Sequence, residues 1–351
     1  DLYYRFVAGL MGPVPADMAA FVEHVRHLPV RLRTLVAPPL MHGTGWFTAL
    51  IGWLTGGAVI LLDHAKKFDA AELWQVVDRE KPTAISIVGD SFAKPLVRAL
   101  EEEGRSYDIS SVVMMVSSGV IWSLETKQAL LKANPKMILA DLFSSSEALA
   151  MGVSVTTADG PVKTGRFKLT DTTRLFDAEL RPIETKPGAR GMVGSCRNQP
   201  VGYYKDPEKT ARTFVQVGED RFSVPGDWAQ VNEDGITLTL LGRGSVCINS
   251  GGEKVFPEEV EEVIKRHAAV EDAVVVGVPD EKYGEAVTAV LSLSPPGADP
   301  EEIQAFVKER LAGYKAPRHL VVVEEIYRTP SGKVDFKHTR KVALEALGLE
   351  A

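Results

Sequence analysis

The sequence is poor in cysteine and has no excess of basic residues. Its two cysteines, Cys196 and Cys247, form no Cys-x-x-Cys pair, which excludes a disulfide framework and a zinc site built from cysteines. The 40 Lys and Arg residues are outnumbered by 47 Asp and Glu residues, for a formal net charge of −7, whereas nucleic-acid binding usually needs a basic face. We therefore expect no nucleic-acid partner and a reducing, cytoplasmic setting.

The chain also has no leader-like beginning and no long uninterrupted hydrophobic run. It opens at Asp1 without a basic and then apolar segment, and we interpret it as part of a longer protein. Residues 45–62 are the most apolar stretch, but Gly56-Gly57 interrupts them, and a membrane-spanning helix needs about 20 apolar residues. The stretch predicts a buried helix followed by a buried strand, and no transmembrane segment.

Hydrophobic residues make up 45% of the 351 positions, enough for two or three domains with sizeable cores. From Thr34 to Leu142, short runs of Val, Ile and Leu alternate with amphipathic helical patterns. Strands that are apolar on both faces predict a mostly parallel sheet covered by helices, and ligands bind such sheets outside the carboxyl ends of the strands. The predicted strands are 35–37, 58–62, 84–88, 112–116 and 137–139, and the predicted helices are 69–79, 91–103 and 124–132.

The amino-acid composition changes in the second half of the chain. Residues 152–234 are rich in Gly, Pro, Thr and turn signals, which predicts an antiparallel β region that completes the first domain. After a glycine-rich stretch at 241–252 we expect a compact α+β unit, with the boundary near Ser245. Its predicted helices are 257–267 and 300–311, and its predicted strands are 273–278, 286–293 and 320–323.

Five local patterns carry the candidate chemistry. Taken singly each has an ordinary explanation, because Pro-Gly-Asp is typical of a turn, Ser-Ser-Ser-Glu of a helix N-cap and Pro-Glu-Glu-Val of a first helical turn. Their joint occurrence in one order is much harder to attribute to chance. The patterns are PPLMHGTG at 38–45, SSGV at 117–120, DLFSSSE at 141–147, VPGDW at 224–228 with LGR at 241–243 and GGEKVFPEEVE at 251–261, and RTPSGK at 328–333.

In this order the patterns resemble those of the adenylate-forming superfamily, and within it the acyl-CoA synthetases, along essentially the whole chain. Residues 201–211 and 241–261 are most similar to the actinobacterial fatty-acid and steroid-side-chain CoA ligases. The resemblance implies an ATP-dependent acid–CoA ligase. A carboxylate attacks the α-phosphorus of ATP to give an acyl-AMP, and coenzyme A then takes the acyl group as a thioester. ATP, Mg²⁺ and coenzyme A are the implied cofactors.

The resemblance assigns catalytic roles to four residues. Both reacting partners are anions, so cations and oriented donors must offset their repulsion in the transition state. Lys333 matches the catalytic lysine of the family, and Ser146 matches a hydroxyl that binds phosphate. Glu147 matches the carboxylate that holds Mg²⁺, and His42 lies at the position beside the reacting carboxylate.

Five further residues match positions that contact the nucleotide. Phe143 takes the place of the aromatic ring on which adenine stacks, and Gly119 and Val120 line the other side of the base. Asp227 matches the acid that accepts both ribose hydroxyls in charge-assisted hydrogen bonds. Arg243 would support the same ribose.

The resemblance also implies a domain arrangement. Residues 1–243 would form part of the large adenylation domain, 244–246 a hinge centred on Ser245, and 247–351 a small mobile domain. Rotation about the hinge would exchange the Lys333 face for a face that binds coenzyme A.

The coenzyme A face is expected to include glycines and basic residues. Gly251 and Gly252 would let pantetheine pass close to the backbone. Residues 308–341 hold nine Lys and Arg against four acids, which fits a contact with the phosphates of coenzyme A or a solvated helix face.

Several positions depart from the family pattern. No Thr/Ser/Gly-rich loop followed by Pro-Lys-Gly precedes the first pattern, and in the family that loop cradles the triphosphate, so we expect Asp1 to begin just downstream of it. Ser144 replaces the usual Gly, and Phe143 replaces the usual Tyr. Ser245 and Asn249 stand where many relatives carry charged residues.

Two other functions stay open at this point. One is an acyl-AMP ligase that loads a carrier protein, although we find no insertion between Arg243 and Pro257 of the kind those relatives carry. The other is a truncated, non-catalytic fragment that binds nucleotide or coenzyme A. Peripheral membrane contact and a homodimer are also open.

We expect the substrate to be a bulky hydrophobic carboxylic acid, either a fatty acid or a steroid side-chain acid. The stretch 45–54 combines large apolar groups with Gly and Ala, as the wall of an acyl tunnel would. Trp46, Phe47 and Trp53 could line such a tunnel or pack in the core.

Overall fold

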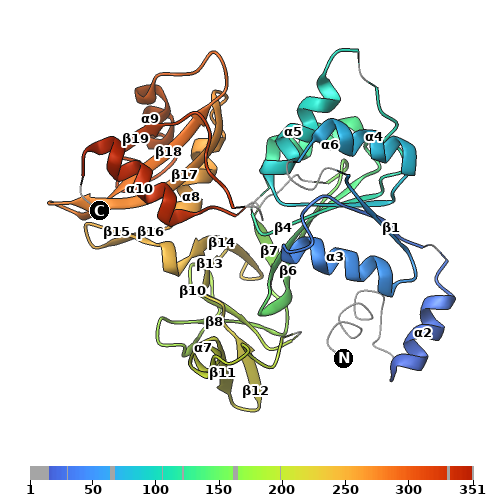
Figure 1. Ribbon diagram of the computed structural model, residues 1–351. Coiled ribbons are helices and arrows are strands. Elements are labelled where there is room, and N and C mark those ends of the chain that lie inside the picture. The colour runs from blue at the N-terminus through green and yellow to red at the C-terminus, as the bar shows by residue number, and fades with distance from the viewer. Residues whose placement is uncertain are drawn as a thin grey trace. The chain divides into compact units, whose positions relative to one another are not determined.

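The computed structural model in Figure 1 describes residues 16–29, 31–63, 68–104, 106–120, 122–160, 165–197, 199–329 and 333–349. These residues form two compact units. The first extends to Pro225 and includes Val231–Thr239, and the second comprises Gly226–Gln230 and the chain from Leu240 onward.

A six-stranded sheet forms the centre of the first unit. Its strand order is β2-β1-β3-β4-β5-β6, parallel except for the antiparallel edge pair β5 and β6. The predicted mostly parallel sheet is therefore confirmed. The strands are β1 (Arg33–Val36), β2 (Ala58–Leu61), β3 (Ala84–Ile87), β4 (Met114–Ser118), β5 (Ile138–Ser145) and β6 (Ala148–Thr156).

Helices cover both faces of this sheet. Figure 1 shows α4, α5 and α6 on one face and α3 on the other. The helix and strand predicted within 45–62 are confirmed as α3 and β2. Their predicted burial is only partial, because α3 exposes Trp46 and Trp53 and β2 is half-buried with Leu61 exposed. Gly56 separates them at φ +67, a backbone conformation that glycine adopts without strain. The helices of this unit are α2 (Met18–Arg26), α3 (Gly43–Leu54), α4 (Ala70–Glu80), α5 (Asp90–Glu101) and α6 (Leu124–Ala133).

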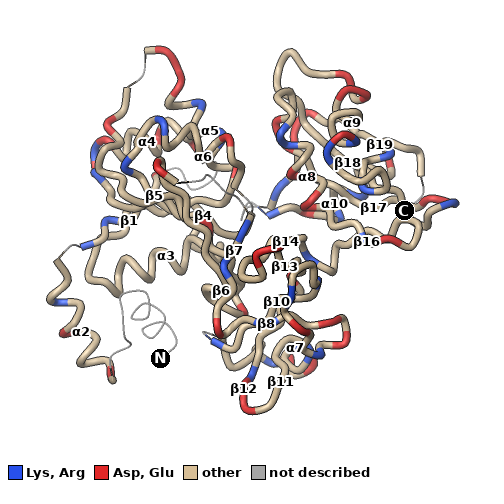
Figure 2. Tube along the Cα trace, turned by 180° about the vertical axis from the view of Figure 1, so that it is seen from behind, with Lys and Arg blue, Asp and Glu red and all other residues tan. Residues whose placement is uncertain are grey.

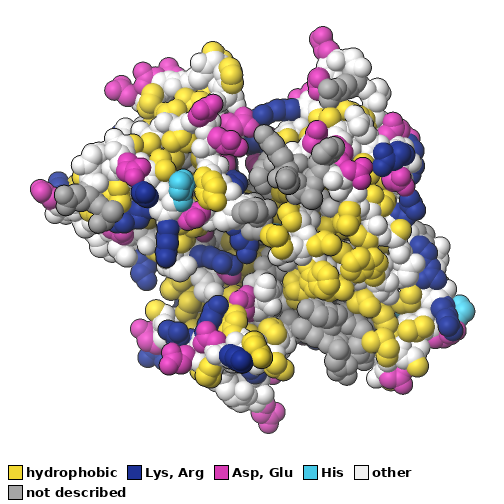
Figure 3. Space-filling model, in the orientation of Figure 1, with side chains coloured by type: hydrophobic (Ala, Val, Ile, Leu, Met, Phe, Trp, Pro, Cys, Tyr) yellow, Lys and Arg dark blue, Asp and Glu magenta, His cyan; other side chains and the backbone are white. Residues whose placement is uncertain are grey.

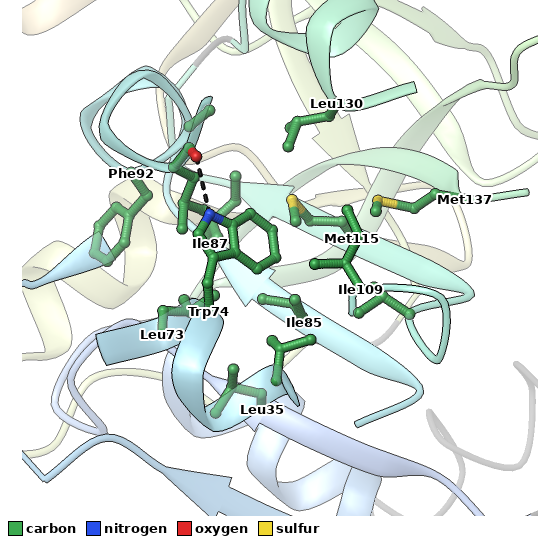
Figure 4. Packing of buried hydrophobic residues seen from close by; sticks show 14 of the residues in the cluster. Leu35, Leu73, Trp74, Ile85, Ile87, Phe92, Ile109, Met115, Leu130 and Met137 are labelled. Carbon is green, nitrogen blue, oxygen red and sulfur yellow. Dashed lines mark hydrogen bonds between the residues drawn. The ribbon is translucent and has the colours of Figure 1, made fainter. Parts of the chain in front are cut away.

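The main core of this unit lies between the sheet and the helices α4 to α6. Trp74 is fully buried there, and its indole N–H donates to the Leu96 carbonyl oxygen at 2.9 Å. Figure 4 shows the ring among side chains from three strands, including Leu35, Ile85 and Met115. The polar group of this buried tryptophan is satisfied in this way.

A buried ion pair connects α6 to β5. The Lys127 ammonium donates to the Asp141 carboxylate, and the two residues are 0% and 5% exposed. Charges removed from water in this way need a close partner, because either one alone would be strongly destabilising. The pair therefore ties the middle of β5 to the helix that precedes it.

The third sequence pattern lies within a strand rather than after one. The sequence predicts a strand over 137–139, but β5 continues to Ser145 because β6 folds back and pairs with it from Leu139 to Ser145. The Ser-Ser-Ser-Glu run is thus the end of a strand and a tight turn, and it caps no helix.

The predicted antiparallel region is confirmed as an eight-stranded sheet. Its order is β11-β12-β10-β13-β14-β7, with β8 pairing β10 and β9. The strands are β7 (Arg166–Lys168), β8 (Thr173–Phe176), β9 (Pro182–Ile183), β10 (Arg190–Ser195), β11 (Phe214–Val217), β12 (Asp220–Ser223), β13 (Asp227–Val231) and β14 (Thr237–Arg243), and the helix α7 spans Pro207–Thr213.

The second unit is a five-stranded sheet with three α-helices, as the α+β prediction expects. The long hairpin of β17 and β18 is its centre, and β19 joins β18 in parallel. The helix α10, which Asp335 caps by accepting from the His338 amide, is not among the predicted helices. The elements are β15 (Ile248–Ser250), β16 (Glu253–Val255), β17 (Val270–Asp280), β18 (Gly284–Leu293), β19 (His319–Val322), η1 (Gly244–Val246), α8 (Pro257–Lys265), α9 (Pro300–Lys308) and α10 (Phe336–Leu347).

Figure 2 shows Lys and Arg interspersed with Asp and Glu along the described chain. None of the described helices has the length and apolar character that a membrane crossing would require.

Within the second unit, Glu258 in the first turn of α8 is packed against the end of β14. The Arg243 amide donates to Glu258 Oε1 at 3.3 Å, whereas Oε2 is buried without a hydrogen-bond partner in the described part of the chain. A Cβ atom at residue 242 would lie 2.1 Å from Oε2. Gly242 also has φ +130, so another residue here would strain the backbone as well as displace the Glu258 side chain.

Burial, reinforced by the nearby Glu261 carboxyl, raises the pKa of Glu258 from 4.5 to about 7. Since the pKa is higher in the folded state, stability is lost as the pH rises from 4.5 to about 7 and stays reduced above that range. The full loss is about 3 kcal/mol.

We predict that Glu258→Gln raises the free energy of unfolding by up to about 3 kcal/mol near pH 8.5 and has little effect near pH 4. The amide keeps the shape of the side chain but carries no charge. Urea unfolding at both pH values measures the difference. Glu302→Gln is the control, because Glu302 lies in the first turn of α9 and is exposed. An equal response of the two variants would contradict the prediction.

Candidate active site

The candidate residues of the first unit follow the ends of the parallel strands. His42 precedes α3, and its Nδ1 accepts the Thr44 amide at 3.1 Å, so the imidazole caps the helix. The Thr44 hydroxyl donates to the Ser118 carbonyl at 3.2 Å. The first and second sequence patterns are therefore joined directly at the end of β4.

Residues from three patterns meet at this edge of the sheet. Gly119 has φ +97, and a Cβ atom built on it would lie 3.4 Å from His42 Cε1. A Cβ atom on Gly43 would lie 3.8 Å from Ser146 Oγ. His42, Gly119 and Ser146 are thus grouped, as expected for the carboxyl ends of neighbouring strands.

The turn between β5 and β6 presents Ser146 and Glu147. Ser145 Oγ accepts the amides of Glu147 and Ala148 at 3.2 and 3.1 Å, and Ser144 Oγ accepts the Ala150 amide at 2.9 Å. Two of the three serines therefore hold the turn, while Ser146 is exposed.

The donor set at this turn suits Mg²⁺. Glu147 offers a carboxylate and Ser146 a hydroxyl, and both are the hard oxygen ligands that Mg²⁺ prefers. The described residues contain no group of three or more His, Cys, Asp or Glu that could hold a metal ion.

Tyr203 joins this site although the sequence analysis assigned it no role. Its hydroxyl donates to Glu147 Oε1 at 2.5 Å. The only signal in the sequence was its place in the run 201–211, which carried part of the family resemblance.

Phe143 is buried, with 6% of its surface exposed, and its ring packs on Phe167 at a centroid distance of 5.5 Å. Val120 is 41% exposed. The stacking of adenine on Phe143 stays a prediction.

In the second unit the hairpin of β13 and β14 brings Asp227 and Arg243 together. Arg243 Nε donates to Asp227 Oδ1 at 3.2 Å, and their side chains are 59% and 16% exposed. Ser245 is exposed in the short η1 helix that follows.

The paired glycines of the second unit have a backbone explanation. Gly251 and Gly252 form the turn between β15 and β16 at φ +63 and +87, which other residues adopt only with strain. Their contact with coenzyme A stays a prediction.

Lys333 is exposed on a turn before α10. Its carbonyl accepts the Thr329 amide at 2.9 Å, and its amide donates to the Thr329 hydroxyl at 3.2 Å. Residues 330–332 of the fifth pattern lie outside the described residues.

Part of the basic segment 308–341 is used for folding. Lys315 pairs with Glu259 at 2.6 Å, and Arg328 pairs with Asp272 at 2.6 Å. Both acids lie outside the segment, so its local positive charge is partly neutralised by the rest of the unit.

The aromatic residues of α3 divide between core and surface. Phe47 packs against a small buried cluster that includes Phe21 and Leu149, whereas Trp46 and Trp53 are 40% and 48% exposed and contact each other edge to face at 6.3 Å. The prediction that Trp46 and Trp53 pack in the core is therefore wrong, because both side chains are exposed. Figure 3 shows hydrophobic side chains gathered over the region where α3 lies in Figure 1.

The chain was compared with known families and proteins. Residues 14–194 match the AMP-binding enzyme family, and residues 259–333 match the AMP-binding enzyme C-terminal domain. Over 307 residues the chain is 41% identical to a medium/long-chain-fatty-acid–CoA/3-oxocholest-4-en-26-oate–CoA ligase of Mycobacterium tuberculosis, covering 87% of this chain and 55% of the relative. Over 310 residues it is 42% identical to a 3-oxocholest-4-en-26-oate–CoA ligase of Rhodococcus rhodochrous, covering 86% and 54%. The chain spans about half the length of the curated relatives it matches.

Solved structures of adenylate-forming enzymes share the fold. The anthranilate CoA ligase AuaEII, solved with anthranoyl-AMP, aligns with a TM-score of 0.76 at 23% identity, covering 99% of this chain and 64% of that one. The amide bond synthetase McbA from Marinactinospora thermotolerans aligns with a TM-score of 0.74 at 26% identity, covering 92% and 64%. Since the first family match alone spans more than half of the 351 residues and lies over the strand ends where His42, Gly119 and Ser146 meet, the chain belongs to the AMP-binding enzyme family.

Proposed function

We propose that the protein is an ATP-dependent acid–CoA ligase that acts on a fatty acid or a steroid side-chain acid. The observation that carries the proposal is the grouping of His42, Gly119 and Ser146 at the carboxyl ends of the sheet, beside the Glu147 carboxylate. Relatives that are 41% and 42% identical are named as ligases for such acids.

In this proposal the first unit binds the phosphates and the reacting carboxylate. The Ser146 hydroxyl donates to a phosphate oxygen, and Glu147 holds Mg²⁺ with ATP. The metal ion would neutralise charge on the phosphate oxygens. His42 lies beside the carboxylate of the acid substrate, where its buried ring, held by the Thr44 amide, excludes water from the reacting atoms.

Residues from Asp227 onward supply the ribose contact and the lysine. Asp227 accepts the ribose hydroxyls, and Arg243 keeps that carboxylate in place through the 3.2 Å contact. Lys333 places a positive charge beside the carboxylate and the α-phosphate during adenylation. Lys333 is exposed, and a charge on a long side chain suits a group that arrives for one step and leaves for the next.

We further propose that residues 1–243 form part of the large domain and residues 247–351 the small one. Residues 244–246, in which Ser245 is exposed, form the hinge between these two domains. The small domain rotates about this hinge between the two half-reactions. The turn at Gly251 and Gly252 then lies beside pantetheine during thioester formation.

The first prediction from the proposed function concerns the reaction and its substrate. We expect CoA-dependent thioester formation with kcat/KM rising steeply with the chain length of the acid, because each buried CH₂ contributes about 0.8 kcal/mol. A panel of acids from acetate to a long-chain fatty acid, with a sterol-derived carboxylate, is assayed for pyrophosphate release and for acyl-CoA on the intact enzyme.

The same assay separates the competing functions. Pyrophosphate release with acyl transfer to a carrier protein but not to CoA would favour an acyl-AMP ligase. Nucleotide binding without pyrophosphate release would favour a non-catalytic role. A preference for acetate would contradict the proposed substrate class.

The second prediction concerns Lys333. We expect Lys333→Ala to lower the rate of adenylation by on the order of 10²–10³ and to spare thioester formation from supplied acyl-AMP, because the charge is needed in only one half-reaction. Single-turnover assays of the two half-reactions measure both rates. Lys136→Ala, at an exposed position outside the segment 308–341, is the control. Equal losses in both half-reactions would assign Lys333 a structural role.

The third prediction concerns Asp227. We expect Asp227→Ala to weaken the binding of ATP and of acyl-AMP by roughly 2–4 kcal/mol, because the ribose hydroxyls lose a charged acceptor. Calorimetric titration measures both affinities, and Asp220→Ala on β12 is the control, since that residue is exposed. A lower melting temperature with unchanged affinities would instead indicate that Asp227 only stabilises a turn.

A further inference from the structure

We propose that Tyr203 is a positioning residue for the carboxylate of Glu147, so that this side chain is already oriented when Mg²⁺ and ATP bind. The inference rests on the proposed function, in which Glu147 is the metal ligand. It adds to the metal site a residue from the loop between β10 and α7.

The contact between the two side chains is short and partly shielded from water. The phenol oxygen of Tyr203 lies 2.5 Å from Glu147 Oε1, a distance typical of an O–H donor on a charged acceptor. Both residues are half-buried. Within the described part of the chain, Oε1 is therefore engaged, and Oε2 is the oxygen left for a cation.

Glu147 is held from two directions. Its amide donates to Ser145 Oγ at 3.2 Å, which fixes the backbone of the turn, and the Tyr203 hydroxyl fixes the end of the side chain. A glutamate has three side-chain torsions, and ordering them costs rotamer entropy. A carboxylate that is already oriented does not bear that cost again when the metal binds.

Tyr203 is itself held rigidly by the α7 segment. Its amide donates to the Thr210 hydroxyl at 2.9 Å, and that hydroxyl donates to the Asp206 carbonyl at 2.7 Å. The ring packs on Phe214 at 6.0 Å, and the Lys209 ammonium lies 4.0 Å from the ring centroid. The backbone and the ring of Tyr203 are thus both held in place, and this orients its phenol hydroxyl toward Glu147.

The neighbouring residue shows that this arrangement is specific to position 203. Tyr204 is 88% exposed, and within the described part of the chain its ring contacts the Lys205 ammonium, at 5.3 Å from the ring centroid. The same residue type one position along the chain therefore provides a control with the same chemistry and no contact with Glu147.

The test measures ATP affinity with and without Mg²⁺, by calorimetry on the intact enzyme. For Tyr203→Phe we expect the gain in affinity that Mg²⁺ provides to fall about tenfold, the size typical of losing a partner that orients a metal ligand. Affinity for ATP without Mg²⁺ and the melting temperature should change little, because the ring remains. Tyr204→Phe should match the unsubstituted enzyme.

A second variant tests whether Tyr203 acts through Glu147. In a Glu147→Gln background, Tyr203→Phe should have no further effect on the Mg²⁺-dependent gain, because the contact it supports is already lost. An additive effect would overturn the proposal.

Three other results would also overturn it. An unchanged gain in Tyr203→Phe would show that the hydroxyl does not support metal binding, and a larger gain would show that it competes with the cation. Equal losses with and without Mg²⁺ would assign Tyr203 a general structural role. If the unsubstituted enzyme shows no Mg²⁺-dependent gain at all, the proposed function itself fails. The three results above contradict only the inference about Tyr203, so the two failures are distinguishable.

Discussion

The buried ion pair between Lys127 and Asp141 is the contact on which the rest of the site depends. It ties the middle of β5 to α6 at a point where both side chains are buried. A one-residue shift of β5 would move Asp141 to the other face of the sheet and break its contact with Lys127. The pair therefore helps to set where β5 ends, and so where Ser146 and Glu147 are presented.

The parallel sheet then gathers residues that are far apart in the chain. Strands β1, β4 and β5 run in the same direction and end at one edge, so His42, Gly119 and Ser146 meet there. The antiparallel region contributes Tyr203, which reaches Glu147 from beside α7. In the second unit a similar constraint acts through Gly242, whose missing side chain makes room for Glu258.

Much of this organisation could be predicted from the sequence because it depends on local chemistry. Asp69 caps α4 by accepting the amides of Ala71 and Glu72, Pro257 opens α8, and Gly56 separates α3 from β2. The limits of β5 were predicted less well, since its last residues are strand only because β6 pairs with them.

The sequence by itself determined the alternation of strands and helices, the start of α8 at Pro257 and the order of the motifs, because each rests on residues close together in the chain. Only the tertiary structure decided that Tyr203 reaches Glu147 across 56 positions, that Asp141 pairs with Lys127 inside the core, and that Trp46 and Trp53 lie at the surface. These contacts depend on strand register and on the packing of whole elements, which no local pattern encodes.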